Sequence, residues 1–138
     1  MSRPDFAPGF LRGVEHFNAL EFWDAHESWE ELWLVAESDL VLFLQGLIQV
    51  AAAYHHMKRG TFRGGVRLFD AGLEKLSAFP LRFCGIDRQA VERAARQHRV
   101  WAADLIARGV DERLAENHYP QLEIVKSSEV PMPPSSEW

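Results

Sequence analysis

The stretch FWDAHESWEELW, residues 22–33, decides the fold and also holds the residues that raise the question of function. Each residue of a helix advances by about 100 degrees, so His26, Glu30 and Trp33 fall on one stripe. The opposite side of this helix is polar and carries Asp24, Ser28 and Glu31. We therefore expect the stripe with an imidazole, a carboxylate and aromatic rings to face the protein interior.

Four more helices are expected around this stretch, and none of the first 109 residues has a strand pattern. The expected helices cover about residues 10–17, 22–36, 39–59, 62–76 and 88–108. Asp39, Thr61 and Asp87 are the expected N-caps, and Gly60 and Gly109 the residues that end helices. The sequence thus predicts an all-α, single-domain helical bundle of about five helices over residues 1–126. The tail becomes irregular, and residues 127–138 have the proline and serine content of a disordered end.

Composition narrows the class of protein. The chain has 138 residues and a net charge of -5, which disfavours nucleic-acid binding. Arg93, Arg96 and Arg99 are close together and Glu92 stands beside them, a pattern typical of a solvated helix face. The one cysteine and the start MSRPDF, which lacks a signal pattern, favour a cytoplasmic protein. The apolar run 40–54 is shorter than the roughly 20 residues needed to cross a bilayer, so we expect no membrane partner.

The third expected helix repeats the pattern of polar residues on an apolar background. Gln45, Gln49 and His56 fall on one stripe, with Ala52 leaving room between them. Polar groups in apolar surroundings need partners. We therefore expect helices two and three to pack antiparallel, so that these side chains meet His26 and Glu30 in one network.

The motif resembles the family of bacterial and archaeal proteins called domain of unknown function 309, with a His, three residues, a Glu, two residues and Trp or Tyr. Further matches are Phe17-Asn18, Ala25-His26-Glu27, Gln45-Gly46-Leu47-Ile48-Gln49, a His before Gly60, and then Gly64, Leu68 and Gly85-Ile86-Asp87. The resemblance covers about residues 14–106. The family usually has Gly where Leu20 stands, Glu at Asp24 and Asn at Thr61. It implies a helical bundle and a metal-binding role for the motif His and Glu, and no substrate.

The residues themselves are compatible with a metal or small-ligand site between helices two and three. His26, Glu30 and His56 would be the metal ligands, with Gln45 and Gln49 orienting them, and Glu27 or Glu30 would act as general base. The cofactor would be a divalent metal ion, and the activity hydrolase-like. HESWE differs from the zinc-protease motif HExxH because Glu30 replaces the second His.

Two alternatives stay open. The same side chains can form a buried hydrogen-bonded network that only fixes helix register. The chain can also be a non-catalytic interaction module in which an exposed aromatic or apolar helix face binds a second copy of itself or another protein. Asp24, Glu27 and Glu31 are expected on a solvated acidic face, where Arg63 or Arg67 could pair with them.

Overall fold

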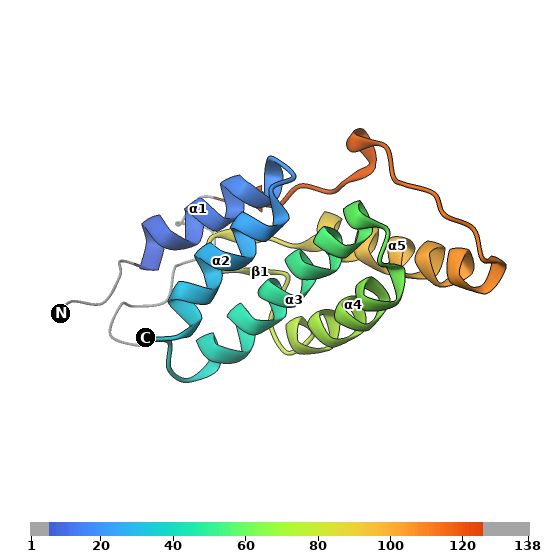
Figure 1. Cartoon of the computed structure of the whole chain (residues 1–138). Coiled ribbons are helices and arrows are strands. Elements are labelled where there is room, and N and C mark those ends of the chain that lie inside the picture. The colour runs from blue at the N-terminus through green and yellow to red at the C-terminus, as the bar shows by residue number, and fades with distance from the viewer. Residues whose placement is uncertain (1–5, 126–138) are drawn as a thin grey trace.

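The computed structural model describes residues 6–125, in which five α-helices follow one another and neighbouring helices run in opposite directions (Figure 1). The helices are α1 (Phe6–Asn18), α2 (Phe22–Trp33), α3 (Asp39–Arg59), α4 (Phe62–Leu76) and α5 (Gln89–Arg108). The prediction of an all-α bundle of about five helices is confirmed. The predicted disordered end, residues 127–138, lies outside the described residues.

α3 is the central helix and packs between α2 and α4. Its apolar sequence explains this position, since Phe43, Leu44 and Tyr54 are fully buried. Among the described helices, α3 alone is long and apolar enough to cross a membrane by length and composition. However, 61% of that apolar window is buried inside the structure. This is the burial that the core helix of a soluble protein shows.

α3 and α4 approach each other through glycines. A Cβ atom built on Gly72 would lie 2.8 Å from the backbone oxygen of Gly46. A Cβ atom on Gly46 would in turn lie 2.8 Å from the Cγ of Leu76. Because these contacts are tighter than side chains allow, the two backbones pack directly against each other at this crossing.

Most helix ends follow the sequence signals. Gly60 and Gly109 end α3 and α5 in the left-handed conformation, with φ of 78° and 66°, as predicted. The expected cap Asp87 acts one position further out, since the backbone N–H of Gln89 donates to its Oδ1 at 2.9 Å. α2 ends at Trp33, before the predicted end near residue 36.

Residues 6–125 contain three two-residue strands, and two of them lie before residue 109, so the expectation of no strand in the first 109 residues is wrong. β1 (Arg82–Phe83) and β2 (Ile86–Asp87) form an antiparallel hairpin, and β3 (Glu123–Ile124) pairs with β2. Cys84 and Gly85 connect the first two strands with φ of 56° and 78°. Two successive residues with positive φ are typical of the tightest hairpin turns. Strands this short have no alternating pattern that the sequence could reveal.

The segment after α5 returns along the bundle and docks on the end of α1 (Figure 1). The Asn18 side chain bonds both backbone groups of Leu122, accepting from its N–H at 2.7 Å and donating to its oxygen at 3.0 Å. Tyr119 packs its ring against Phe22, at 5.5 Å between centroids. Asn18 therefore ties residues more than a hundred positions apart.

A buried ion pair joins the hairpin region to α5. Arg88 is 1% exposed, and its Nε donates to Glu92 Oε2 at 2.8 Å. Its other nitrogens donate to the backbone oxygens of Leu76, Phe79 and Pro80. Glu92 is 3% exposed, so its predicted place on a solvated face is wrong. The charge pattern around Glu92 in the sequence did not indicate this pair, because Arg88 precedes the helix.

Candidate functional site

The orientation of α2 decides which motif residues reach solvent. Its buried residues are Phe22, Ala25, Trp29 and Leu32. Trp29 is fully buried, fills the space left by Gly13, and its Nε1–H donates to the backbone oxygen of Phe10 at 3.1 Å. This apolar stripe, and not the one with Glu30, faces the core. The expectation that Glu30 points inward is wrong, since its side chain is 48% exposed.

His26 lies at the edge between the buried and exposed sides of α2, with its side chain 16% exposed. Its Nε2 is 3.5 Å from Glu30 Oε2, longer than the 2.7–2.9 Å typical of a charge-assisted hydrogen bond. The imidazole stacks on the indole of Trp23, with ring centroids 4.5 Å apart and planes 13° apart. Its Nδ1 is buried and has no hydrogen-bond partner among residues 6–125. The ring is thus held in place while neither nitrogen makes a short hydrogen bond.

The two neighbouring histidines of α3 face different ways. His55 packs on Trp23, the indole on which His26 also stacks, at 5.1 Å between ring centroids. His56 turns toward α4, where its Nδ1 hydrogen-bonds with Thr61 Oγ1 at 2.6 Å. Burial lowers the pKa of both imidazoles, and nearby positive charge, above all that of Arg59, lowers each pKa further. Both rings therefore favour the neutral form at pH 7.

The glutamines of α3 are half-buried. Gln49 Oε1 is buried and lacks a hydrogen-bond partner within the described residues. In residues 6–125, no hydrogen bond connects Gln45, Gln49 or His56 to His26 or Glu30. The network expected between α2 and α3 is therefore not formed by direct hydrogen bonds in this part of the chain.

The ligand atoms of His26, Glu30 and His56 do not converge within 4.8 Å in the described part of the chain. One other group there does, namely His16, Glu21 and Asp24. These residues lie on either side of the turn between α1 and α2, and His16 Nδ1 is 2.9 Å from Glu21 Oε1.

Sequence reasoning missed this turn cluster (His16, Glu21 and Asp24) because its geometry depends on Leu20. That residue adopts φ of 63° and so takes the conformation of the glycine that the family usually has there. Lys58 Nζ also donates to the Leu20 backbone oxygen at 3.1 Å, which holds the turn against the end of α3. A turn of this kind leaves no periodic pattern in the sequence, so a search for helical periodicity does not find it.

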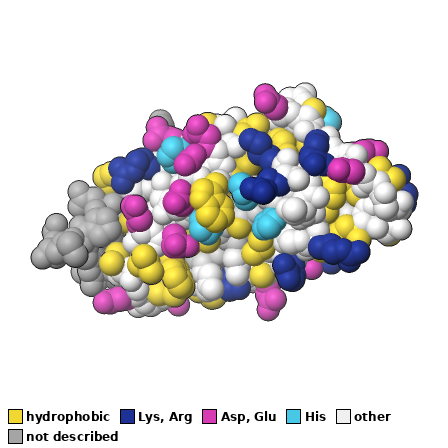
Figure 2. All heavy atoms as spheres, viewed as in Figure 1, with side chains coloured by type: hydrophobic (Ala, Val, Ile, Leu, Met, Phe, Trp, Pro, Cys, Tyr) yellow, Lys and Arg dark blue, Asp and Glu magenta, His cyan; other side chains and the backbone are white. Residues whose placement is uncertain are grey.

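Figure 2 shows the surface formed by α2, α3 and α4. Histidine side chains gather around an apolar patch, with acidic groups on one side of it and basic groups on the other. The exposed aromatic residue of this region is Trp23, at 48% exposure. Glu27 is exposed on α2, one residue beyond His26. The site is therefore an open surface with an aromatic centre and separated charges.

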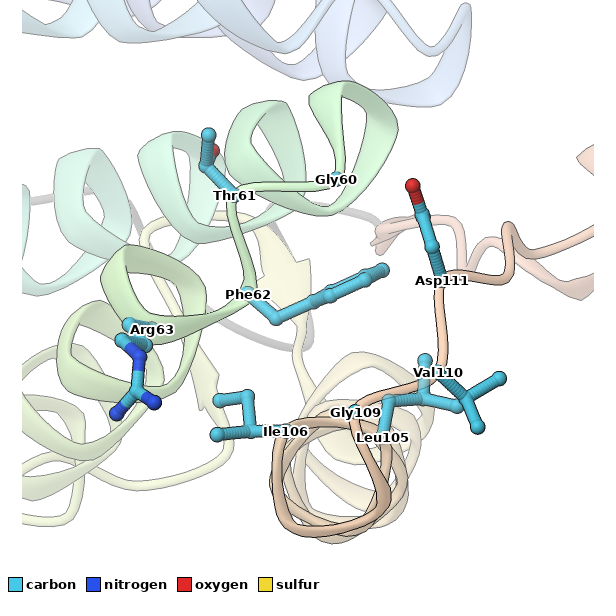
Figure 3. A pocket seen from close by; sticks show the side chains of 9 residues that line it. All are labelled: Gly60, Thr61, Phe62, Arg63, Leu105, Ile106, Gly109, Val110 and Asp111. Carbon is cyan, nitrogen blue, oxygen red and sulfur yellow. The ribbon is translucent and has the colours of Figure 1, made fainter.

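A groove of about 480 Å³ lies elsewhere, between the start of α4 and the end of α5 (Figure 3). Its walls are mostly apolar, and the Phe62 ring projects between α4 and the segment that follows α5. Asp111 stands at the opposite wall, while the Arg63 side chain points away. None of the motif residues lines this groove.

The buried Tyr54 and the half-buried His98 form a pair outside the motif that the sequence did not predict. The Tyr54 hydroxyl hydrogen-bonds with His98 Nδ1 at 2.8 Å. Burial lowers the pKa of His98 to about 4 and raises that of Tyr54. Cys84 is also buried, and burial raises the pKa of its thiol to about 12, so it is a packing residue and no nucleophile.

Comparison with known proteins gives a family without an assigned activity. No curated protein matches the chain. The residues from Phe10 to Leu68, which contain α2, α3 and the motif, match the family model described as Domain of unknown function (DUF309). This match supports the family predicted from the His26 motif, and residues 10–68 are similar to DUF309.

Proposed function

We propose that His26 and Glu30 bind a divalent metal ion on the open α2–α3 surface, and that the chain acts on a small molecule there. The observation that carries the proposal is the spacing of the two ligand atoms. Two ligands at about 2.0–2.1 Å from a tetrahedral ion lie about 3.4 Å apart. His26 Nε2 and Glu30 Oε2 are 3.5 Å apart.

The surroundings of the pair fit the same role. Trp23 fixes the plane of the His26 ring, and the buried Nδ1 leaves Nε2 as the nitrogen directed toward Glu30. Because Glu30 is half exposed, water or substrate can reach the remaining coordination positions. Structural zinc sites are closed by four protein ligands, so a site with two protein ligands and open positions is not of the structural type.

A bound divalent ion would supply Lewis-acid activation of a substrate oxygen or of a water molecule. The protein groups around it would position the substrate and move protons. Glu27 is the exposed carboxylate nearest in sequence to His26, and it remains our candidate for the general base, with Glu30 as a ligand. His56 and the glutamines would then act from α3 on the substrate or on bound water, since they do not join the pair directly.

The test is metal binding by protein purified without a histidine tag. Zinc and manganese are titrated by calorimetry into the wild type, His26→Ala, Glu30→Gln and the control His118→Ala, an exposed histidine far along the chain. We expect stoichiometric binding by the wild type and the control, and at least a tenfold weaker affinity for each site variant, as for loss of one ligand.

The turn cluster provides the opposing outcome. His16→Ala removes its only imidazole and leaves His26 intact. If this variant loses the metal while His26→Ala keeps it, the ion belongs to the turn between α1 and α2, and the proposal for His26 is refuted. Absence of stoichiometric binding by the wild type refutes it as well.

A second candidate function is a non-catalytic interaction module, favoured by exposed apolar side chains on α2 and just beyond its end. The side chains of Trp23 and Leu34 are 48% and 70% exposed. They are eleven residues apart, which is close to a whole number of helical turns, so they lie on the same side. The occupant would be a second copy of the chain. Light scattering after size exclusion would show a dimer that Trp23→Ser/Leu34→Ser reduces to a monomer, whereas a wild-type monomer at high concentration would exclude this candidate.

A further inference from the structure

Six of the eleven arginines in residues 6–125 are paired with carboxylates. The ion pairs in the described residues include Arg82–Asp87, Arg88–Glu92, Arg96–Glu92, Arg99–Asp70, Arg108–Asp104 and Arg113–Asp111. Five arginines in the described residues make no ion pair, and three of these five lie together where α3 ends and α4 begins. Arg59, Arg63 and Arg67 make no ion pair within residues 6–125, although the chain carries a net charge of -5. The expected pairing of Arg63 or Arg67 with the acidic residues of α2 is thus not formed there.

The charges are also placed where they repel one another. Arg63 and Arg67 are four residues apart on α4, a spacing at which like charges weaken a helix. The positive N-terminal end of the α4 dipole lies at the same place. This repulsion destabilises the protein without a ligand. A bound anion would neutralise the positive charges and remove the repulsion.

Histidines complete this positive region. The His56 ring lies over Gly64, where a Cβ atom would be only 3.1 Å away, so the backbone at the start of α4 comes close to the imidazole. Arg59 follows His56 by three residues on α3, and Arg67 follows Gly64 by three residues on α4, so each arginine lies about one helical turn from the His56–Gly64 contact. Burial lowers the pKa of His56, and the charges of Arg59 and Arg67 lower it further. Guanidinium, imidazole and backbone N–H groups are all donors that suit the oxygens of a phosphate group.

We propose that Arg59 and Arg67, together with His56, bind the phosphate group of a small-molecule ligand. A single phosphate monoester carries about two negative charges and several acceptor oxygens, which matches two guanidinium groups and an imidazole. A polyanion is disfavoured, because the acidic residues of α2 lie on the same surface beyond the histidines (Figure 2). The site would give the proposed metal centre a phosphate-bearing substrate, but phosphate binding itself does not depend on the metal.

The experiment uses the full chain, treated with EDTA, so that the result is independent of the metal proposal. Inorganic phosphate is titrated by calorimetry at pH 7 and low ionic strength. Arg59→Gln and Arg67→Gln are compared with Arg12→Gln and Arg93→Gln, two exposed arginines that also lack ion pairs in the described residues. All four variants lose one positive charge, so the general electrostatic effect is matched.

We expect phosphate to bind one site, and Arg59→Gln and Arg67→Gln each to weaken it about tenfold or more, as for loss of a charge-assisted hydrogen bond. The two controls should change affinity by less than about twofold. Equal weakening in all four variants would show diffuse charge attraction and overturn the proposal. No binding of phosphate at millimolar concentration, or equally tight binding of acetate, would overturn it too.

Retained metal affinity in Arg59→Gln would separate the two proposals. If phosphate binds as expected but no metal does, the anion site stands and the metal centre falls. If the metal binds to His26 and Glu30 but phosphate does not bind, the reverse holds.

Discussion

Replacing Arg88 by Met should destabilise the protein more than almost any other change of a charged residue. The variant keeps the long unbranched side chain and removes the guanidinium group, which makes four hydrogen bonds of 2.8–3.2 Å. Three of these satisfy backbone oxygens at or after the last residue of α4, and one satisfies Glu92. Arg88 is 1% exposed, so water cannot replace these partners without local opening.

The expected loss in the free energy of unfolding is about 3–5 kcal/mol, the range for breaking a buried ion pair by removing one partner. Since a domain is stable by only about 5–15 kcal/mol, this is a large fraction. At roughly 3–5 °C per kcal/mol for a chain of this size, the melting temperature should fall by about 10–20 °C.

Urea unfolding followed by circular dichroism measures the effect, with Arg93→Met on the exposed side of α5 as control. The control should change stability by less than about 0.5 kcal/mol. Arg88→Met/Glu92→Leu should recover about 1–3 kcal/mol relative to the single variant, because it no longer buries an uncompensated carboxylate. A cost below about 1 kcal/mol for Arg88→Met, or a double variant less stable than the single one, would refute the reasoning.

Three further changes test other parts of the fold. Gly72→Ala should cost about 1–3 kcal/mol in thermal unfolding, because its Cβ would lie 2.8 Å from the Gly46 oxygen, and no loss would mean that the helices can separate there. The pKa of His98 is about 4 in the folded protein and 6.5 unfolded, so its contribution is complete above pH 6.5 and is lost as the pH falls through 4. The half-exposed ring should make this loss about 2 kcal/mol, and His98→Asn should remove that part of the pH dependence in urea titrations. Asn18→Ala should cost about 1–2 kcal/mol and speed hydrogen exchange around Leu122, and unchanged exchange would show that other contacts hold this segment.

The sequence predicted the helices well because their signals are local. Apolar periodicity placed α1 to α5, and glycines in the left-handed conformation ended α3 and α5 where expected. The hairpin around Cys84 was not predicted, because each strand has only two residues and the turn depends on positive φ at a non-glycine residue. Leu20 illustrates the same limit, since tertiary contacts hold a leucine where propensity favours glycine.

The candidate site was only partly predictable, because a helical stripe gives relative and not absolute orientation. The stripe with His26 and Glu30 was correctly grouped, but Trp29 and its apolar neighbours turned α2 so that Glu30 reaches solvent. Adjacent histidines on α3 point about 100 degrees apart, so the sequence could not assign them to α2 or α4. The structure directs His55 to Trp23 and His56 to Thr61.

The direct backbone contact between Gly46 and Gly72 also bears on how the site could close around a ligand. Because the Gly46 and Gly72 backbones approach each other directly at this crossing, α3 and α4 have little freedom to slide and should move as one rigid body. The proposed phosphate residues belong to this body, whereas the proposed metal ligands belong to α2. Any closure would then be a rocking of α2 about its two end turns. Hydrogen exchange would show this as ligand-dependent protection of α2 and its turns, with α3 and α4 protected equally in both states.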